Sequence, residues 1–239
     1  MSASDPFISI KNLNKRYGRI PAIDQMNLDI FSNELIGIVG NNGSGKTTFL
    51  KLLLDLLLPD SGSVFFRGKN VHRSDHWKHK TGAYIDESFL IDYLTPGEYI
   101  RLLGQMRGLS LAAIEECLDR MRQFVTFNII RESKLIRSLS DGNKHKLGIL
   151  GAVLFKTELI ILDEPFNFLD PASQHDLVRI LRESAVKQKA TIIISSHNLQ
   201  FVSQICSRVI LFESGRIMDD FQNSPESLSR LKTYFNIES

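Results

Sequence analysis

The sequence predicts an α/β fold built on a mainly parallel sheet, and three observations support this prediction. An apolar run at 34–40 leads directly into the glycine-rich segment GNNGSGKT at 40–47. Two further apolar runs, at 159–162 and 191–195, lie on either side of a segment with helical periodicity at 172–188. Short apolar runs that alternate with helical segments are typical of parallel strands joined by crossover helices.

Two additions to this core are expected. Turn residues separate three segments near the N-terminus that are rich in strand-forming residues, which predicts an antiparallel β subdomain; they are 7–17, 22–31 and 63–71. The leucines of 46–58 recur at helical spacing, and helical patterns dominate from about 88 to 150. We therefore expect an α-helical subdomain inserted in the core. Because no linker or repeat interrupts the sequence, residues 1–239 are expected to form a single domain.

Composition is that of an ordinary soluble protein. Hydrophobic residues make up 43% and charged residues 23% of the sequence, a balance that allows a buried core. The net charge of +2 gives no reason to expect nucleic acid or an anionic membrane as the main partner. The start of the chain lacks a signal-peptide pattern, and the apolar run at 147–155 is far shorter than the roughly 20 residues that span a bilayer. We expect a soluble chain with reduced, buried Cys117 and Cys206.

The segment 40–47 fits the phosphate-binding pattern G-x-x-x-x-G-K-[ST]. Glycines allow successive backbone N–H groups to surround a phosphate, and the following helix N-terminus adds positive potential. Lys46 is expected to reach the β- and γ-phosphates of a nucleoside triphosphate, and the Thr47 hydroxyl to bind Mg²⁺. The alternative is a chance glycine-rich turn, but the strand before the loop and the helix after it favour a P-loop NTPase core. The residues expected to hold the nucleotide are Gly40, Asn41, Asn42, Gly43, Ser44, Gly45, Lys46, Thr47 and Thr48.

Asp163 and Glu164 follow the apolar run 159–162, at the carboxyl edge of an expected parallel strand. Ligands bind at that edge of such sheets. Asp163 is placed to hold Mg²⁺, and Glu164 to polarise the water that attacks the γ-phosphate. His197, after the run 191–195, can contact the γ-phosphate and orient that water. In isolation a solvated acidic pair and a half-buried histidine at a strand end are the simpler interpretations, but the nearby phosphate-binding loop favours catalytic roles.

A group of three histidines gives a second candidate site. His72, His76 and His79 recur at i, i+4 and i+7, which predicts that they share one face of a helix. Such a face can bind a metal ion. Because arginine and lysine flank the histidines, an exposed polar helix is the favoured interpretation.

The motifs follow one another over nearly the whole chain, and the sequence resembles the nucleotide-binding domain of the ATP-binding-cassette (ABC) ATPases. The segment LSDGNKHK at 139–146 is similar to the family's signature of leucine, serine, two glycines and glutamine followed by basic residues. The resemblance implies that Tyr17 stacks on adenine and that Glu87 lies in the loop that senses Mg²⁺ and contacts a membrane partner. It also implies that Asp170 belongs to the loop after the catalytic glutamate, and that His197 is the switch histidine.

The resemblance also implies a partner. In this family two domains pack head to tail as a two-fold dimer, and each ATP lies between the phosphate-binding loop of one copy and the signature of the other. We therefore expect a second copy of this chain, or a homologous ABC subunit, as partner. Ser140, Gly142 and the N-terminus of the signature helix are expected to contact the γ-phosphate that the partner binds.

Five residues depart from the family pattern. Asp141 stands where a signature glycine is commonest, and Asn143 where glutamine is. Glu87 replaces a glutamine, and Phe166 and Phe168 enlarge a loop that often carries smaller residues. None of these changes removes an expected catalytic group, so we expect a competent ATPase.

The function that the resemblance implies is that of the ATP-hydrolysing subunit of an ABC transporter, which drives a separately encoded membrane permease. Within 87–109, the side chains of Phe89, Leu90, Tyr93 and Tyr99 suit a docking groove for the permease. The alternative is that most of them pack the helical subdomain. This segment resembles the corresponding segment in one branch of the ABC family, whose members serve multidrug, antibiotic-resistance and polysaccharide exporters. The expected location is the cytoplasm, on the inner face of the cell membrane. The alternative is a soluble, non-transport ABC ATPase, for example in iron–sulfur cluster assembly or translation, although these 239 residues contain no tandem cassette or long coiled-coil insertion.

Overall fold

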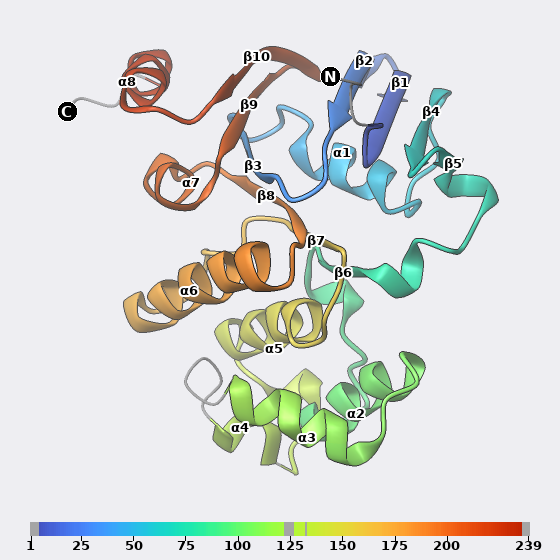
Figure 1. Ribbon diagram of the computed structural model, residues 1–239, viewed down its shortest axis with the longest axis vertical. Helices are drawn as coiled ribbons and strands as arrows, with labels where there is room; N and C mark the ends of the chain where they lie inside the picture. The colour runs from blue at the N-terminus through green and yellow to red at the C-terminus, as the bar shows by residue number, and fades with distance from the viewer. Residues whose placement is uncertain (1–4, 122–126, 132, 236–239) are drawn as a thin grey trace.

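The computed structural model describes residues 5–121, 127–131 and 133–235, and it arranges them around two sheets (Figure 1). A four-stranded antiparallel sheet has the order β2-β1-β4-β5, and a six-stranded sheet has the order β10-β9-β3-β8-β7-β6. The first sheet comprises β1 (Ile8–Tyr17), β2 (Ile20–Ile30), β4 (Ser61–Phe66) and β5 (Lys69–Asn70). The second comprises β3 (Leu35–Val39), β6 (Thr81–Tyr84), β7 (Leu159–Leu162), β8 (Thr191–Ser196), β9 (Arg208–Glu213) and β10 (Arg216–Gln222).

Five of the six strands of the central sheet are parallel, which confirms the predicted fold class. Strand β3 pairs with β8 and β9, and β7 pairs with β8 and β6. Only the edge strand β10 runs antiparallel, after a turn at Ser214 and Gly215 in which both residues have positive φ. Because β3, β8, β7 and β6 are adjacent, the segments that leave their carboxyl ends meet along one edge of the sheet.

Eight α-helices are formed within the described residues. They are α1 (Lys46–Leu53), α2 (Pro96–Met106), α3 (Leu111–Arg120), α4 (Phe127–Arg131), α5 (Asp141–Val153), α6 (Pro171–Lys187), α7 (Leu199–Ile205) and α8 (Pro225–Tyr234). Helices α2 to α5 lie between β6 and β7 in the sequence, as predicted for the helical insertion, and α2 to α4 gather at the end of the molecule opposite the antiparallel sheet (Figure 1). Positions 122–126 and 132 of that insertion lie outside the described residues. No described helix is both long and apolar enough to cross a bilayer.

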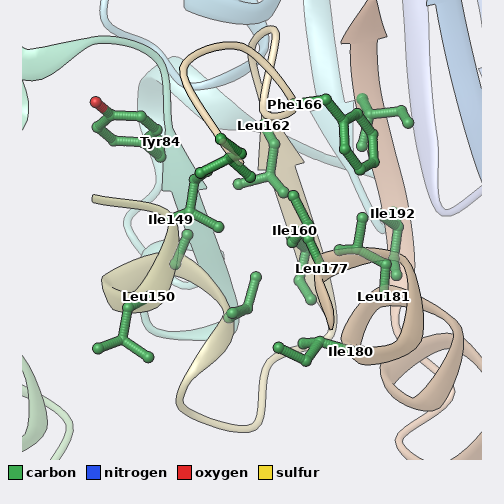
Figure 2. Close-up of a cluster of buried hydrophobic side chains, with 14 of the residues drawn as sticks. Tyr84, Ile149, Leu150, Ile160, Leu162, Phe166, Leu177, Ile180, Leu181 and Ile192 are labelled. Carbon is green, nitrogen blue, oxygen red and sulfur yellow. The ribbon is translucent and has the colours of Figure 1, made fainter. Parts of the chain in front are cut away.

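Hydrophobic side chains cover both faces of the central sheet. On β8, Ile192 and Ile194 belong to the core under α5 and α6, whereas Ile193 belongs to the core shared with α1 and the antiparallel sheet. Figure 2 shows Ile160, Leu162 and Ile192 of the sheet packed against side chains of α5 and α6. Burial on both faces explains why these strands are continuous apolar runs with no polar alternation.

Three sequence predictions of local structure were wrong in part or in full. The helix expected over 46–58 stops at Leu53, because Asp55 adopts φ 54° and the Leu56 N–H bonds to the Lys51 carbonyl in a left-handed C-terminal cap. The strand expected over 63–71 is split by a turn at Arg67 and Gly68, which both have positive φ, so that β5 folds back on β4. The expected helix with three histidines is two short 3₁₀ segments, Val71–Arg73 and Lys78–Lys80.

The three histidines therefore do not share a helix face. The side chain of His72 pairs with Asp55 at 3.0 Å, and that of His76 bonds to Ser74 at 2.7 Å. Among the described residues, no group of three histidine, cysteine, aspartate or glutamate side chains could hold a metal ion.

Candidate active site

The loop between β3 and α1 has the backbone that a phosphate-binding loop requires. Gly43 and Gly45 have φ of 81° and 105°, which other residue types rarely adopt. A Cβ atom at Gly45 would lie 2.4 Å from the Ala22 carbonyl oxygen, and one at Gly40 would lie 2.4 Å from that of Phe212. The hydroxyl of Ser44 is buried without a hydrogen-bond partner in the protein. Because a buried orphan donor needs a partner, this hydroxyl fits a phosphate oxygen of a bound nucleotide.

Lys46, the first residue of α1, folds back over this loop. Its Nζ donates to the carbonyl oxygens of Gly40, at 2.7 Å, and Asn41, at 3.2 Å. Burial lowers the pKa of Lys46, and the carboxylates of Glu164 and Asp163 oppose that shift. The ammonium group is thus held inside the loop, where a phosphate can replace its carbonyl partners.

The side chain of Asp163 contacts helix α1 and strand β8 at the carboxyl edge of the sheet. Asp163 follows β7, and its Oδ2 lies 2.5 Å from Oγ1 of Thr47, which is in the first turn of α1. Its Oδ1 accepts a hydrogen bond from the hydroxyl of Ser195 on β8. The adjacent hydroxyl and carboxylate oxygens of Thr47 and Asp163 are hard donors of the kind that Mg²⁺ prefers, so these residues fit the expected metal.

Glu164 and His197 also come together. His197 follows β8, and its Nδ1 lies 2.9 Å from Oε2 of Glu164. The other carboxylate oxygen of Glu164 lies 3.9 Å from Nζ of Lys46. The backbone N–H of Glu164 donates to Oγ of Ser195 at 2.9 Å, which fixes the start of this segment. The structure therefore gathers Lys46, Glu164 and His197, the three predicted catalytic residues, around one point.

Tyr17 lies at the end of β1, opposite Ile20 of β2 in the hairpin, and its side chain is largely exposed. The same hairpin passes close to the phosphate-binding loop, because the carbonyl of Ala22 packs against Gly45. An exposed aromatic ring beside such a loop is available to stack on a nucleobase.

The signature segment forms the start of α5. Ser140 is the N-terminal cap residue, but its side chain makes no capping hydrogen bond. Among the described residues, no hydrogen bond or ion pair connects Ser140 or Gly142 with the loop 40–47. The first residues of α5 instead contact the segment after Glu164: Lys146 pairs with Asp170 at 2.5 Å, and His145 Nε2 lies 3.2 Å from the Pro165 carbonyl oxygen.

Asp170 and the two phenylalanines shape that segment. Asp170 caps α6 by accepting from the Ser173 N–H, and its bonds to Lys146 and Ser173 hold its pKa well below the usual range. Phe166 is buried and stacks on Phe201 at 4.2 Å between ring centroids. Phe168 is 73% exposed and has φ 59°, a backbone conformation that is strained for a bulky residue.

Glu87 does not join the oxygen donors of Thr47 and Asp163. It begins a short 3₁₀ segment after β6, and its Oε2 lies 3.6 Å from Nζ of Lys144 on α5. The predicted metal ligands are thus brought together only in part.

Sequence reasoning missed two contributors to the site. Ser195 contacts both Asp163 and Glu164, and its only signal was its place two residues before His197. Lys144 gave no signal beyond being one of several basic residues in the signature segment, because its contact with Glu87 depends on the tertiary fold.

The sequence of this chain is similar to one family model and to the two known proteins described next. The family model described as ABC transporter matches residues 23–167. The uncharacterized ABC transporter ATP-binding protein YdbJ of Bacillus subtilis (strain 168) is 32% identical over 216 residues, which cover 90% of this chain and 68% of that protein. The bacitracin transport ATP-binding protein BcrA of Enterococcus faecalis is 32% identical over 216 residues, covering 89% of this chain and 68% of BcrA.

The fold has a similarly close match among solved structures. One described as the ATP binding subunit of an ABC transporter superposes with a TM-score of 0.83 at 26% sequence identity, and the match covers 97% of this chain and 94% of that one.

Proposed function

The chain belongs to the ABC transporter family, and we propose that it is the ATP-hydrolysing subunit of an ABC transporter. The observation that carries this proposal is the convergence of five side chains, from three separate segments, at the carboxyl edge of the central sheet. They are Lys46, Thr47, Asp163, Glu164 and His197.

Each of these residues has a role that its geometry supports. Lys46 and the Ser44 hydroxyl bind phosphate oxygens of ATP, and Tyr17 stacks on the adenine. Thr47 and Asp163 hold Mg²⁺, which supplies positive charge that neutralises the phosphates. Glu164 accepts a proton from the attacking water, and its contact with His197 supports a role for the imidazole in orienting the same water. In this proposal Asp163 binds the metal, and the next residue, Glu164, accepts the proton.

We propose that the signature acts on a second copy of the chain, or on a homologous subunit. The hydroxyl of Ser140 does not cap its own helix, and the N-terminus of α5 is an anion-binding end of a 13-residue helix. Within the part of the chain that the structure describes, no hydrogen bond or ion pair joins the signature to the phosphate-binding loop, so a head-to-tail dimer would let the signature complete the other copy's site. Ser140, Gly142 and Asp170 belong to this proposed dimer face.

We further propose that the chain couples ATP hydrolysis to a separately encoded membrane permease. This coupling is supported by BcrA, a relative named for bacitracin transport, and by the exposed side chain of Tyr93. Leu90 and Tyr99 of the expected docking groove are buried and pack the core instead. We favour export, because 87–109 resembles the exporter branch. The chain would then act at the cytoplasmic face of the membrane through its permease. The non-transport ABC ATPase is the competing function.

ATP turnover tests the catalytic part of the proposal. Glu164→Gln is expected to retain ATP binding while hydrolysis falls by about 10²-fold or more. Lys46→Ala is the matched comparison, because it should weaken nucleotide binding itself. Turnover of Glu164→Gln close to that of the unmodified chain would remove Glu164 from the proposed role. For transport, co-expression with a permease encoded beside it should yield a membrane complex whose ATPase activity differs from that of the free chain; failure to assemble would favour the non-transport function.

A further inference from the structure

The hydroxyl of one buried serine lies beside both acidic residues of the proposed site. Ser195 is in β8, and it is fully buried. Leu162 of β7 pairs with Ile194 of β8, so Asp163 and Ser195 come directly after this pair in two parallel strands. Because side chains alternate along a strand, Ser195 lies on the same face of β8 as Ile193, which belongs to the core shared with α1. The hydroxyl is therefore on the side of the sheet from which α1 starts.

This hydroxyl acts as a donor and as an acceptor at the same time. Its proton is donated to Oδ1 of Asp163, and Oγ accepts the N–H of Glu164 at 2.9 Å. Oδ2 of Asp163 then faces the hydroxyl of Thr47, 2.5 Å away. Among side chains of similar size, few can donate and accept from one atom. Ser195 therefore fixes the orientation of one carboxylate and the backbone position of the next residue.

The backbone of Glu164 has a conformation that needs such support. Its φ of 46° is uncommon for a residue other than glycine. In an extended strand, the side chains of consecutive residues point to opposite faces. Here both carboxylates reach the first turn of α1, because Asp163 contacts Thr47 and Oε1 of Glu164 lies 3.9 Å from Nζ of Lys46. The left-handed turn at Glu164 brings its carboxylate to the edge that Asp163 already occupies.

Other contacts hold Glu164 beyond its N–H group. Its carbonyl accepts the N–H of Asn167 at 3.2 Å, and its Oε2 accepts the backbone N–H of His197 at 3.3 Å. Ser195 holds the N–H itself, at the point where the chain leaves β7. Strained backbone conformations persist only where the surrounding structure fixes them. Without the Ser195 acceptor, Glu164 is expected to relax toward ordinary backbone angles, which draws its carboxylate away from Lys46 and His197.

We propose that Ser195 is a positioning residue for ATP hydrolysis. Its hydroxyl holds the Asp163 carboxylate toward Thr47, and it holds the left-handed turn that places the Glu164 carboxylate near Lys46. This proposal rests on the proposed function, because it concerns the alignment of the metal-binding carboxylate with the proton-accepting one. Ser195 acts through these two carboxylates and is not itself a catalytic residue.

Steady-state ATP hydrolysis provides the first test. Ser195→Ala is expected to lower kcat by about tenfold and to change KM for ATP by less than about threefold, because the phosphate-binding loop is left intact. Ser207→Ala is the matched control. The Ser207 hydroxyl also accepts a backbone N–H and donates to an oxygen, both of Leu35 at 3.2 Å, but it lies at the amino end of β3. This control should keep kcat within about twofold of the parent. A kcat of Ser195→Ala within twofold of the parent would overturn the proposal.

A double-mutant cycle distinguishes positioning of Glu164 from a general loss of stability. The residual hydrolysis of Glu164→Gln is measured in single turnovers at saturating Mg²⁺. Adding Ser195→Ala should lower it by less than about threefold, because the carboxylate that Ser195 places is already absent. A tenfold loss in both backgrounds would show that Ser195 does not act through Glu164.

The role toward Asp163 is tested without turnover. Mn²⁺ binding to the ATP complex is followed by electron paramagnetic resonance in the Glu164→Gln background, at protein concentrations that keep the chain monomeric. Adding Ser195→Ala is expected to weaken Mn²⁺ binding by about tenfold, because groups that orient a metal ligand tune its affinity. Adding Ser207→Ala should change it by less than about twofold. An unchanged Mn²⁺ affinity with Ser195→Ala would contradict this role.

Amide hydrogen exchange of the nucleotide-free chain separates this proposal from the proposed function. Exchange of the Glu164 N–H, followed by nuclear magnetic resonance, should be at least about tenfold faster in Ser195→Ala than in the parent. The Asp163 N–H donates to the Tyr84 carbonyl at 3.0 Å and should exchange at the parent's rate. Equal exchange of the Glu164 N–H in both chains would overturn the positioning contact, even in a chain that hydrolyses ATP. Faster exchange in a chain whose parent does not hydrolyse ATP would contradict the proposed function but not the contact.

Discussion

Thr47 and Asp163 are 116 residues apart in the sequence, yet Thr47 Oγ1 and Asp163 Oδ2 lie 2.5 Å apart. The order of the central sheet produces this proximity, because β3 and β7 both pair with β8 and end at the same edge. Ser195 of β8 bonds to the other oxygen of Asp163 and fixes its orientation. The pair is thus preorganised by the fold.

If this oxygen pair holds Mg²⁺, replacing Thr47 should affect ATP binding only when the metal is present. Thr47→Ala is expected to weaken ATP binding by about tenfold with Mg²⁺ and by less than twofold in excess chelator. Titration with a fluorescent ATP analogue under both conditions measures the difference. An equal loss with and without Mg²⁺ would indicate that Thr47 contacts the nucleotide and not the metal.

Asp141 is expected to tune dimer closure. It lies in the first turn of α5, where a carboxylate stabilises the helix through the dipole. The same carboxylate would approach the partner's triphosphate in the dimer. Asp141→Gly should therefore tighten the ATP-bound dimer by about 1 kcal/mol and slightly destabilise the monomer. Dimer dissociation constants of both proteins in the Glu164→Gln background provide the measurement, and the difference should narrow as salt is raised. A mutant dimer equal to or weaker than the parent at low salt would leave Asp141 with only its helix-stabilising role.

His145 should make the stability of the fold depend on pH. It is buried against Tyr84 and Phe168, and burial lowers its pKa, while the Pro165 carbonyl and the Glu87 carboxylate oppose the shift. The folded state therefore binds this proton less readily than the unfolded state, and the stability associated with neutral His145 is lost as the pH falls below about 6.5. His145→Gln should reduce the loss of melting temperature between pH 7.5 and 5.5. An unchanged loss in the variant would exclude His145 as a source of the pH dependence.

Much of the fold was predictable because its strands are buried on both faces. The run 159–162 coincides with β7, and 191–195 differs from β8 by a single residue. The end of α1 was not predictable from leucine spacing, because the reversal at Asp55 depends on a left-handed backbone at a residue other than glycine. Strand β5 was missed for a similar reason, since Arg67 also has positive φ.

The site was predictable where a short motif carries its own chemistry. Lys46 and Thr47 follow from the glycine pattern, and Asp163 and Glu164 from the end of an apolar strand. The contact between Glu87 and Lys144 joins the segment after β6 to α5, and their approach is set by the packing of α5 against β6. Gly148 of α5 has no room for a Cβ atom against the ring of Tyr84, which shows how close that packing is. Single-sequence patterns contain no signal for such a contact.

The central claim is that each ATP is held between the phosphate-binding loop of one copy and the signature of another. Light scattering of Glu164→Gln at micromolar concentration tests it directly. Without nucleotide the mass should be that of the 27.1 kDa chain, and ATP should double it, because the closed state alone satisfies both γ-phosphates. Lys46→Ala in the same background should remain monomeric with ATP. A Glu164→Gln chain that binds ATP yet shows no increase in mass across micromolar protein concentrations would contradict the shared site.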